Sequence, residues 1–309
     1  MESQHLIFDE KPTLKNPVLL MAFSGWSDAA ESATEAATYL IKKYSAKRFA
    51  HIDSENFFEF SDTRPTVSLD NSGERVIEWP ENEFYYFSIP SQKRDVVIGI
   101  GKEPHFRWKS FSICMLDFIK KINPTITVTM GAFLSASSHL NEVMLVCLAS
   151  NPQLAKSIGV DLSDYEGPTG IVGILQNTFQ RNNLDSISLW GNVPHYLANV
   201  KNPKVAYTLL EKFAELSEIP LDLETLKNHS EAFSRKVDDA ISKDSKLSQY
   251  VTDLDSEELE DEVIMSHEEI DLNSTDFSTD FEEELPPGDE VADEIEELMR
   301  RKKRDSDEE

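Results

Sequence analysis

Cysteine is scarce in this chain. Only Cys114 and Cys147 occur among the 309 residues, and each lies inside an apolar stretch. Two buried thiols are typical of a reducing compartment, and they are too few for a disulfide framework or a cysteine-based zinc site. The seven histidines include no pair at metal-ligand spacing on one helix, so the sequence predicts neither a metal site nor a cofactor.

Long hydrophobic runs are absent as well. The longest, such as Val18 to Phe23 and Val143 to Ala149, fall far short of the roughly 20 residues that a membrane helix needs. The first residues, Met1 to Gln4, show neither the basic patch nor the apolar segment of a secretory signal. We therefore expect a cytoplasmic protein that does not bind membranes.

Positive charge is in short supply. Lys and Arg number 30 and Asp and Glu number 57, which gives a net charge of −27. Residues 251–309 hold 25 acidic and 5 basic residues, a net of −20, whereas the first 250 hold 32 and 25, a net of −7. Both parts would repel a phosphate backbone, so we expect no nucleic-acid partner.

The acidic tail, residues 252–309, differs physically from the rest of the chain. It is dense in Asp, Glu and Ser, and such a segment cannot bury enough apolar surface to offset its ordering entropy, so we predict disorder. Residues 290–304 are an exception, because Val291, Ile295 and Leu298 follow helical spacing. Two interpretations stay open: a tail that aids solubility, or a short helix that docks in a partner's groove.

Strands and helices alternate along residues 1–251, which we interpret as one α/β domain. The order strand, helix, strand over residues 18–53 predicts a right-handed crossover within a parallel sheet. Residues 66–79 predict a hairpin around Asn71-Ser72-Gly73. The whole pattern predicts a three-layer α/β/α fold with a mixed, largely parallel sheet. The predicted strands are 18–24, 47–53, 66–69, 75–79, 84–88, 95–100, 125–130, 143–148 and 186–190; the predicted helices are 28–44, 108–122, 169–181, 203–215 and 221–251.

The first candidate site segment follows the strand 18–24. In open α/β sheets, ligands bind at the carboxyl ends of the strands. At this position in the chain, Gly25 would let the backbone approach a ligand, and Trp26 would offer an aromatic face. The helix start at Asp28 favours anions. The structural alternative is that Asp28 caps the helix N-terminus and Glu31, three residues later, is its reciprocal partner in a capping box.

The second candidate segment contains Glu166, Gly167, Thr169 and Gly170. A loop, a threonine cap and glycines at a helix start are typical of an anion site, although the Gly-Lys-Ser/Thr ending of a P-loop is missing. The structural alternative is that Gly170 and Gly173 allow this helix to pack closely on a neighbour.

The third candidate segment contains Trp190, Pro194 and His195, again after a strand. His195 is the best-placed titratable group in the chain, but no Asp, Ser or Cys nearby completes a triad, so a structural role is the favoured interpretation. Gly131 ends another strand at the same predicted edge. Trp26 and Trp190 are suited to stacking on a planar ligand, so these positions together predict a strand-end pocket.

Six strings in the body carry a family resemblance. They are Ser24-Gly25-Trp26-Ser27-Asp28-Ala29, Arg64-Pro65-Thr66, Glu78-Trp79-Pro80-Glu81-Asn82, Glu103-Pro104-His105-Phe106-Arg107-Trp108, Tyr165-Glu166-Gly167-Pro168-Thr169-Gly170, and Trp190 with Pro194-His195-Tyr196. Together they resemble the bacterial branch of the proteasome assembly chaperone 2 family. The resemblance implies a fold similar to that of purine nucleoside phosphorylases and a homo-oligomer, with a trimer as the expected number. It also implies a protein partner, because eukaryotic relatives form a heterodimer that helps proteasome α-subunits assemble into a ring.

Two departures from the family pattern affect the expected activity. The family usually has Pro-His-Thr-Arg where this chain has Ser138-His139-Leu140-Asn141, and the missing arginine removes the most obvious ligand for phosphate. Some of these chaperones dock on the proteasome through a C-terminal motif of three residues: a hydrophobic residue, a tyrosine and one further residue. In this chain, residues 305–309 read Asp-Ser-Asp-Glu-Glu instead. We therefore expect neither phosphorolysis nor that docking mode.

Two functions remain open. The leading hypothesis is a non-enzymatic assembly factor or adaptor for a protein complex, related to the proteasome, for which no catalytic residue is predicted. The alternative is an enzyme or binding module for a nucleoside-like or carboxylate-bearing small molecule in the strand-end pocket.

Overall fold

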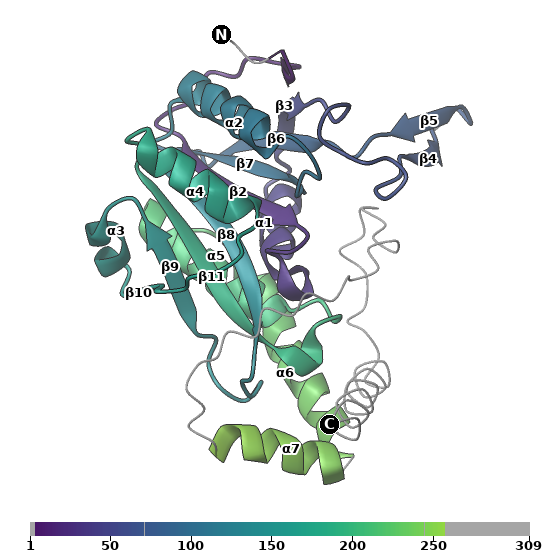
Figure 1. The fold of residues 1–309 in the computed structure, drawn as a ribbon, viewed down its shortest axis with the longest axis vertical. Helices are drawn as coiled ribbons and strands as arrows, with labels where there is room; N and C mark the ends of the chain where they lie inside the picture. The colour runs from purple at the N-terminus through teal and green to yellow at the C-terminus, as the bar shows by residue number, and fades with distance from the viewer. Residues whose placement is uncertain (1–3, 71, 244, 257–309) are drawn as a thin grey trace.

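A nine-stranded mixed sheet forms the centre of the fold (Figure 1). The computed structural model describes residues 4–70, 72–243 and 245–256. In spatial order the strands are β1 (Leu6–Phe8), β3 (Lys47–Ile52), β6 (Asn82–Ser88), β7 (Asp95–Lys102), β2 (Val18–Ser24), β8 (Ile126–Ser135), β11 (Ser186–Pro194), β9 (Leu145–Ala149) and β10 (Asp161–Leu162). The neighbours β7, β2, β8 and β11 are parallel, whereas β6 and β9 flank them antiparallel.

Strand β2 shows why the domain has three layers. Leu20 and Ala22 point into a core on one face of the sheet, whereas Leu19 and Met21 point into a core on the other face, and all four are fully buried. A continuous apolar run is the sequence that a strand covered on both faces requires. The helices are α1 (Ser32–Lys43), α5 (Pro203–Ser217) and α6 (Glu224–Ser242) on the first face, and α2 (Trp108–Ile122) and α4 (Ile171–Arg181) on the second. The predicted α/β/α architecture is confirmed.

The place of β3 in the sheet differs from the simplest form of the predicted crossover. β3 runs in the same direction as β2, but β6 and β7 lie between the two strands. The chain therefore crosses two strand positions after α1, and the antiparallel pair β6–β7 later fills the gap. Local periodicity cannot report this order, because pairing depends on residues far away in the sequence.

Two predicted helices have different limits in the structure. Ala30 and Glu31 have φ angles of 53° and 51°, so α1 begins only at Ser32, after the short 3₁₀ turn η1 (Ala29–Glu31). The predicted helix 221–251 is divided into α6 and α7 (Ser245–Ser256). Four short elements lack the periodicity needed for prediction: β1, α3 (Pro152–Ser157), β10 and the 3₁₀ turn η2 (His195–Leu197).

A two-stranded sheet stands apart from the main one. β4 (Thr66–Leu69) pairs antiparallel with β5 (Arg75–Glu78), as the sequence predicted, and neither strand joins the nine-stranded sheet. Figure 1 shows this hairpin projecting from the body of the molecule. All eight of its strand residues are exposed.

The expectations drawn from composition can be compared with the described residues. None of their helices is both long and apolar enough to cross a bilayer. Cys114 and Cys147 are buried in the cores on opposite faces of the sheet, so no disulfide joins them. Helix α7 runs to Ser256, past the predicted start of the tail at residue 252. The predicted disorder beyond it and the predicted helix 290–304 lie outside the described residues.

Candidate functional site

The first candidate segment lies at the carboxyl end of β2, as predicted. Gly25 has a φ of +122°, a conformation that side chains rarely adopt, and it turns the chain toward α1. The Asp28 carboxylate accepts hydrogen bonds from the backbone N–H groups of Ala33 at 2.7 Å and Thr34 at 3.3 Å. The Thr34 hydroxyl donates a third hydrogen bond to Asp28. Asp28 therefore occupies the N-terminus of α1, where an anionic ligand would have bound.

The cap differs in one respect from the predicted capping box. Asp28 reaches five and six residues ahead, across η1, and Glu31 is not its reciprocal partner. The Glu31 carboxylate instead lies 3.5 Å from the Lys201 ammonium. Burial raises the pKa of Asp28 from 3.8 to about 7, although the hydrogen bonds from Thr34 and Ala33 oppose the shift.

Glu103 fills the second predicted anion site. This residue follows the end of β7, and its Oε1 accepts a hydrogen bond of 2.5 Å from the backbone N–H of Ile171, the first residue of α4. Burial raises the pKa of Glu103, and hydrogen bonds from the N–H groups of Ile171 and Trp26 act against that shift. This role of Glu103 cannot be predicted from local sequence, because its contact with α4 joins residues 68 positions apart.

Trp26 and Gly170 meet in the same cluster. A Cβ at Gly170 would lie 2.7 Å from Glu103 Oε1, 2.7 Å from Ser27 Oγ and 3.0 Å from the Trp26 ring. The absence of a side chain at Gly170 thus lets β2, β7 and α4 approach one another. We call this group, Gly25, Trp26, Ser27, Glu103 and Gly170, the strand-end cluster.

Gly131 and Trp190 form a second close contact at the sheet. They are paired in the β8–β11 register, and a Cβ at Gly131 would lie 2.6 Å from the Trp190 ring. The Trp190 indole N–H donates a hydrogen bond of 2.8 Å to Ser188 Oγ. The ring of Trp190 therefore lies against Gly131 of the neighbouring strand.

The loop before α4 is open to solvent. Glu166, Gly167 and Thr169 are exposed, and the Tyr165 hydroxyl closes the turn with a hydrogen bond of 3.1 Å to the Pro168 carbonyl. Of the four predicted residues in this segment, only Gly170 is buried. The helix start is thus built as predicted, but its N–H group binds Glu103 and not the loop.

Pro194 is the last residue of β11, and His195 begins the 3₁₀ turn η2. His195 is buried, with Nδ1 3.2 Å from the Ser135 carbonyl oxygen and Nε2 2.7 Å from the Tyr250 hydroxyl on α7. Both ring nitrogens are used within the fold, which agrees with the structural interpretation of this residue. That Pro194 and His195 line one pocket together with the strand-end cluster stays a prediction.

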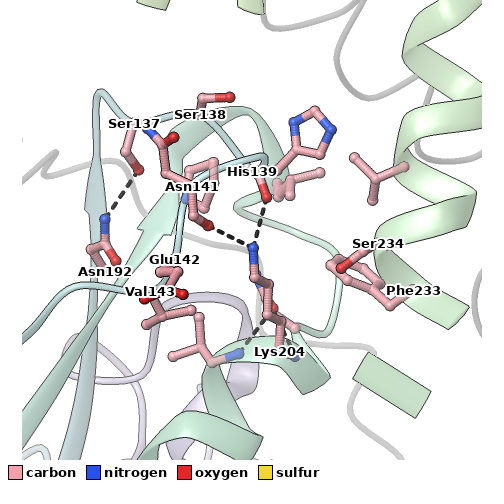
Figure 2. A pocket seen from close by; sticks show the side chains of 15 residues that line it. Ser137, Ser138, His139, Asn141, Glu142, Val143, Asn192, Lys204, Phe233 and Ser234 are labelled. Carbon is pink, nitrogen blue, oxygen red and sulfur yellow. Dashed lines mark hydrogen bonds between the residues drawn. The ribbon is translucent and has the colours of Figure 1, made fainter. Parts of the chain in front are cut away.

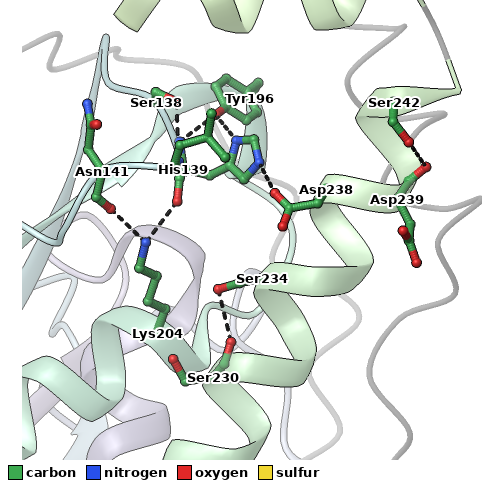
Figure 3. A network of polar contacts seen from close by, with 11 residues as sticks. Ser138, His139, Asn141, Tyr196, Lys204, Ser230, Ser234, Asp238, Asp239 and Ser242 are labelled. Carbon is green, nitrogen blue, oxygen red and sulfur yellow. Dashed lines mark hydrogen bonds and ion pairs between the residues drawn. The ribbon is translucent and has the colours of Figure 1, made fainter.

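A polar network that the sequence did not predict includes Tyr196, whose ring contacts that of His195. Figure 3 shows the network around Tyr196 and His139. His139 places Nδ1 2.7 Å from the Tyr196 hydroxyl and Nε2 2.9 Å from Asp238 Oδ1 on α6. The Lys204 ammonium donates hydrogen bonds to the carbonyl oxygens of His139 at 2.8 Å and Asn141 at 2.6 Å. Burial lowers the pKa of His139, and the hydrogen bond to Asp238 opposes this shift. The network fixes the loop between β8 and β9 against α5 and α6.

A small hollow of about 20 Å³, partly open to solvent, lies beside this network (Figure 2). It has room for about one water molecule and is too small for a small-molecule ligand. Its polar groups are already bonded: Asn192 accepts a hydrogen bond of 2.8 Å from the Met144 N–H and donates one of 3.1 Å to Ser137 Oγ. The described part of the chain holds no cluster of three or more metal-ligating side chains. Chemically, this arrangement supports a loop and provides no activated nucleophile.

Comparison with known proteins gives one family. The model of the PAC2 family matches residues 22–241. A PAC2 family protein from Streptomyces avermitilis is 35% identical, with a TM-score of 0.71, and the match covers 76% of this chain and 99% of that one.

Two further solved structures carry more specific names. The proteasome-assembly chaperone homologue Rv2125 of Mycobacterium tuberculosis is 31% identical, with a TM-score of 0.69 and coverage of 76% and 99%. The archaeal proteasome activator PbaB of Pyrococcus furiosus is 22% identical, with a TM-score of 0.61 and coverage of 77% and 100%, which shows a shared fold.

Proposed function

The chain belongs to the PAC2 family, and on that basis we propose that it is a non-enzymatic assembly factor or adaptor for a protein complex, with a role in proteasome assembly. The similarity to a protein named as a proteasome-assembly chaperone homologue, at 31% identity over nearly the whole of that chain, supports this choice of client.

One observation carries the proposal. The chain's own carboxylates fill both helix N-termini that were candidates for binding an anionic substrate. Asp28 accepts hydrogen bonds from the N–H groups of Ala33 and Thr34 in the first turn of α1, and Glu103 accepts one from the N–H group of Ile171 at the start of α4. A phosphate or carboxylate ligand would have to displace a buried carboxylate at either place, and two negative charges in one buried site repel each other. This favours a binding protein over an enzyme that acts on a charged metabolite at the strand ends.

The proposal includes three further properties. We propose that copies of the chain form a homo-oligomer, that its partners are proteins such as proteasome subunits, and that it acts in the cytoplasm. The acidic residues of the chain provide attraction to a basic surface on a client, which would raise the rate of association and weaken with added salt.

The test is affinity purification from the native cells after cross-linking, followed by mass spectrometry of both proteins and extracted small molecules. The full chain is compared with a chain truncated after Ser256, the last described residue of α7. We expect proteasome subunits or their assembly intermediates in stoichiometric amount with the full chain. A retained metabolite that raises the melting temperature, with no protein partner, would overturn the proposal in favour of the small-molecule alternative.

A further inference from the structure

The side chains that β8 and β11 present to α4 are small and polar. Thr127 and Thr129 on β8 are paired with Ser186 and Ser188 on β11, so the four side chains share one face of the sheet. The residues between them on each strand point into the opposite core. Helix α4 lies over the polar face (Figure 1), and Gln176 on α4 donates a hydrogen bond of 3.4 Å to the Ser186 carbonyl oxygen. We call these five residues the polar seam.

The sequence of the two strands is unusual for the centre of a parallel sheet. β8 begins Ile-Thr-Val-Thr-Met and β11 begins Ser-Ile-Ser-Leu, so apolar and polar residues alternate in both. This alternation is typical of a strand with one face in water, whereas a strand covered on both faces is normally apolar throughout, as β2 is. In the structure α4 covers the polar face, and every residue of the seam is at most 4% exposed. The sequence thus indicates contact with water at a place that bulk solvent does not reach.

Hydrogen bonding within the seam is incomplete. Among the described residues, six buried side-chain nitrogen or oxygen atoms have no hydrogen-bond partner in the protein, and three of them belong to the seam: Thr129 Oγ1, Gln176 Oε1 and Ser186 Oγ. A fourth, Ser27 Oγ, lies beside Gly170 at the start of α4. Buried polar atoms of native proteins are nearly always bonded, either to protein or to ordered water, because leaving one unbonded is costly. The gathering of such atoms under one helix therefore calls for a partner.

The chemistry of the seam selects water as that partner. Gln176 Oε1 can only accept a hydrogen bond, whereas the hydroxyl groups of Thr129 and Ser186 can both donate and accept, and water can serve all three. Buried water typically has two to four polar partners, and the seam offers three. None of the seam residues is ionisable, so nothing in the seam favours an ion. Serine at positions 186 and 188 also leaves more room than the valine or isoleucine usual in such a strand.

We propose that ordered water is bound in the polar seam, between Gln176 and the hydroxyl groups of Thr129 and Ser186, and that α4 is attached to the sheet partly through this water. The other serine of the seam already has a partner, because Ser188 Oγ accepts a hydrogen bond of 2.8 Å from the Trp190 indole N–H. Hydration explains why two central strands keep a polar face under a helix.

The direct test is a crystal structure of the full chain at a resolution that shows ordered water. We expect a water molecule within hydrogen-bond distance of Gln176 Oε1 and of at least one of the two hydroxyl groups, Thr129 Oγ1 and Ser186 Oγ. A seam without water, in which these atoms stay unbonded or bond one another, would overturn the proposal.

The sign of a stability change gives a second test. Thr129→Val replaces the hydroxyl group by a methyl group of nearly the same shape, and its effect is measured as the midpoint of urea unfolding of the full chain. If water bonds Thr129 Oγ1, the substitution removes a hydrogen bond and the midpoint falls, which is the result we expect. If the hydroxyl group is unbonded, valine removes a costly buried polar atom, so a midpoint that rises or stays unchanged would overturn the proposal.

Thr178→Val is the matched control on α4 itself. The Thr178 hydroxyl donates a hydrogen bond of 2.7 Å to the Ile174 carbonyl oxygen one turn earlier, at a half-buried position. This substitution exchanges the same two residue types without involving the seam, and we expect a smaller fall in the midpoint than for Thr129→Val. An equal or larger fall would show that the effect at Thr129 is not specific to the seam, and it would count against the bound water.

Discussion

Replacement of Asp28 by asparagine tests the reasoning about the α1 terminus most sharply. The side chain is buried, and its pKa is raised from 3.8 to about 7 by that burial. A carboxyl group whose pKa is higher in the folded state stabilises the fold below pH 3.8, and this contribution is lost as pH rises to about 7. Asparagine keeps an oxygen that can accept from the Ala33 N–H but does not ionise.

The magnitude follows from linkage. The shift is about 3 pH units, and at 1.36 kcal/mol per unit it corresponds to roughly 4 kcal/mol between low and high pH. The chain has a pI near 4.6, so measurements are best made above pH 5.5, where solubility is not limiting. Between pH 5.5 and 8 the expected change from Asp28 is about 2 kcal/mol. This is a substantial part of the 5–15 kcal/mol typical of a domain.

The assay is urea unfolding at pH 5.5, 6.5, 7.5 and 8, followed by tryptophan fluorescence. We expect the free energy of unfolding of the wild type to fall relative to Asp28→Asn by about 2 kcal/mol over this range. The matched control is Glu31→Gln, which removes a carboxylate from the same turn but at a half-exposed position, and its curve should run parallel to the wild type. If the Asp28→Asn and wild-type curves are parallel, the assignment of a buried, proton-sensitive cap is wrong.

Three further predictions follow from individual contacts. Gly170→Ala places a Cβ 2.7 Å from Glu103 Oε1, and we expect a loss of about 1–3 kcal/mol in urea unfolding; an unchanged midpoint would contradict the close packing of the strand-end cluster. Gly131→Ala pushes against the Trp190 ring at 2.6 Å, and we expect a similar loss with a red shift in tryptophan emission, whereas an unshifted spectrum would show that the ring is not confined. The pKa of His139 is lowered in the folded state, so its stabilising contribution is present above pH 6.5 and is lost as pH falls. The melting temperature of the wild type should therefore drop toward that of His139→Gln between pH 7.5 and 5.5. A difference between the two melting temperatures that stays constant over this range would contradict the lowered pKa.

The sequence was informative wherever burial alone decides the structure. The run Val18–Ser24 is apolar throughout because both of its faces are covered, and the 108–122 helix has the predicted limits because its apolar stripe faces a single core. The hairpin around Gly73 followed from turn chemistry. The crossing of β3 over two strand positions was not readable, since register and order depend on partners that are distant in the chain.

The candidate site was only partly predictable for the same reason. Glycines and tryptophans at strand ends identified Gly25, Trp26, Gly131, Gly170 and Trp190, which the structure does place in close contacts at the sheet. The side chains that complete the candidate site contact residues that are distant in the sequence.

Glu103 reaches α4 over 68 positions, and Asp238 reaches His139 over 99 positions. Neither residue stands out by type or spacing. In the sequence, the Ser138–Asn141 string differs from the family pattern by its missing arginine, whereas in the structure its His139 anchors the polar network.

The central claim is that this chain promotes assembly of a protein complex, and ring formation by proteasome α-subunits tests it most directly. Purified α-subunits from the same cells would be mixed with or without the full chain, and the assembly intermediates would be followed over time by native mass spectrometry. The account predicts that the chain binds the intermediates, speeds ring formation and is absent from the finished particle. Equal rates with and without the chain, together with no complex between the chain and any α-subunit, would contradict it.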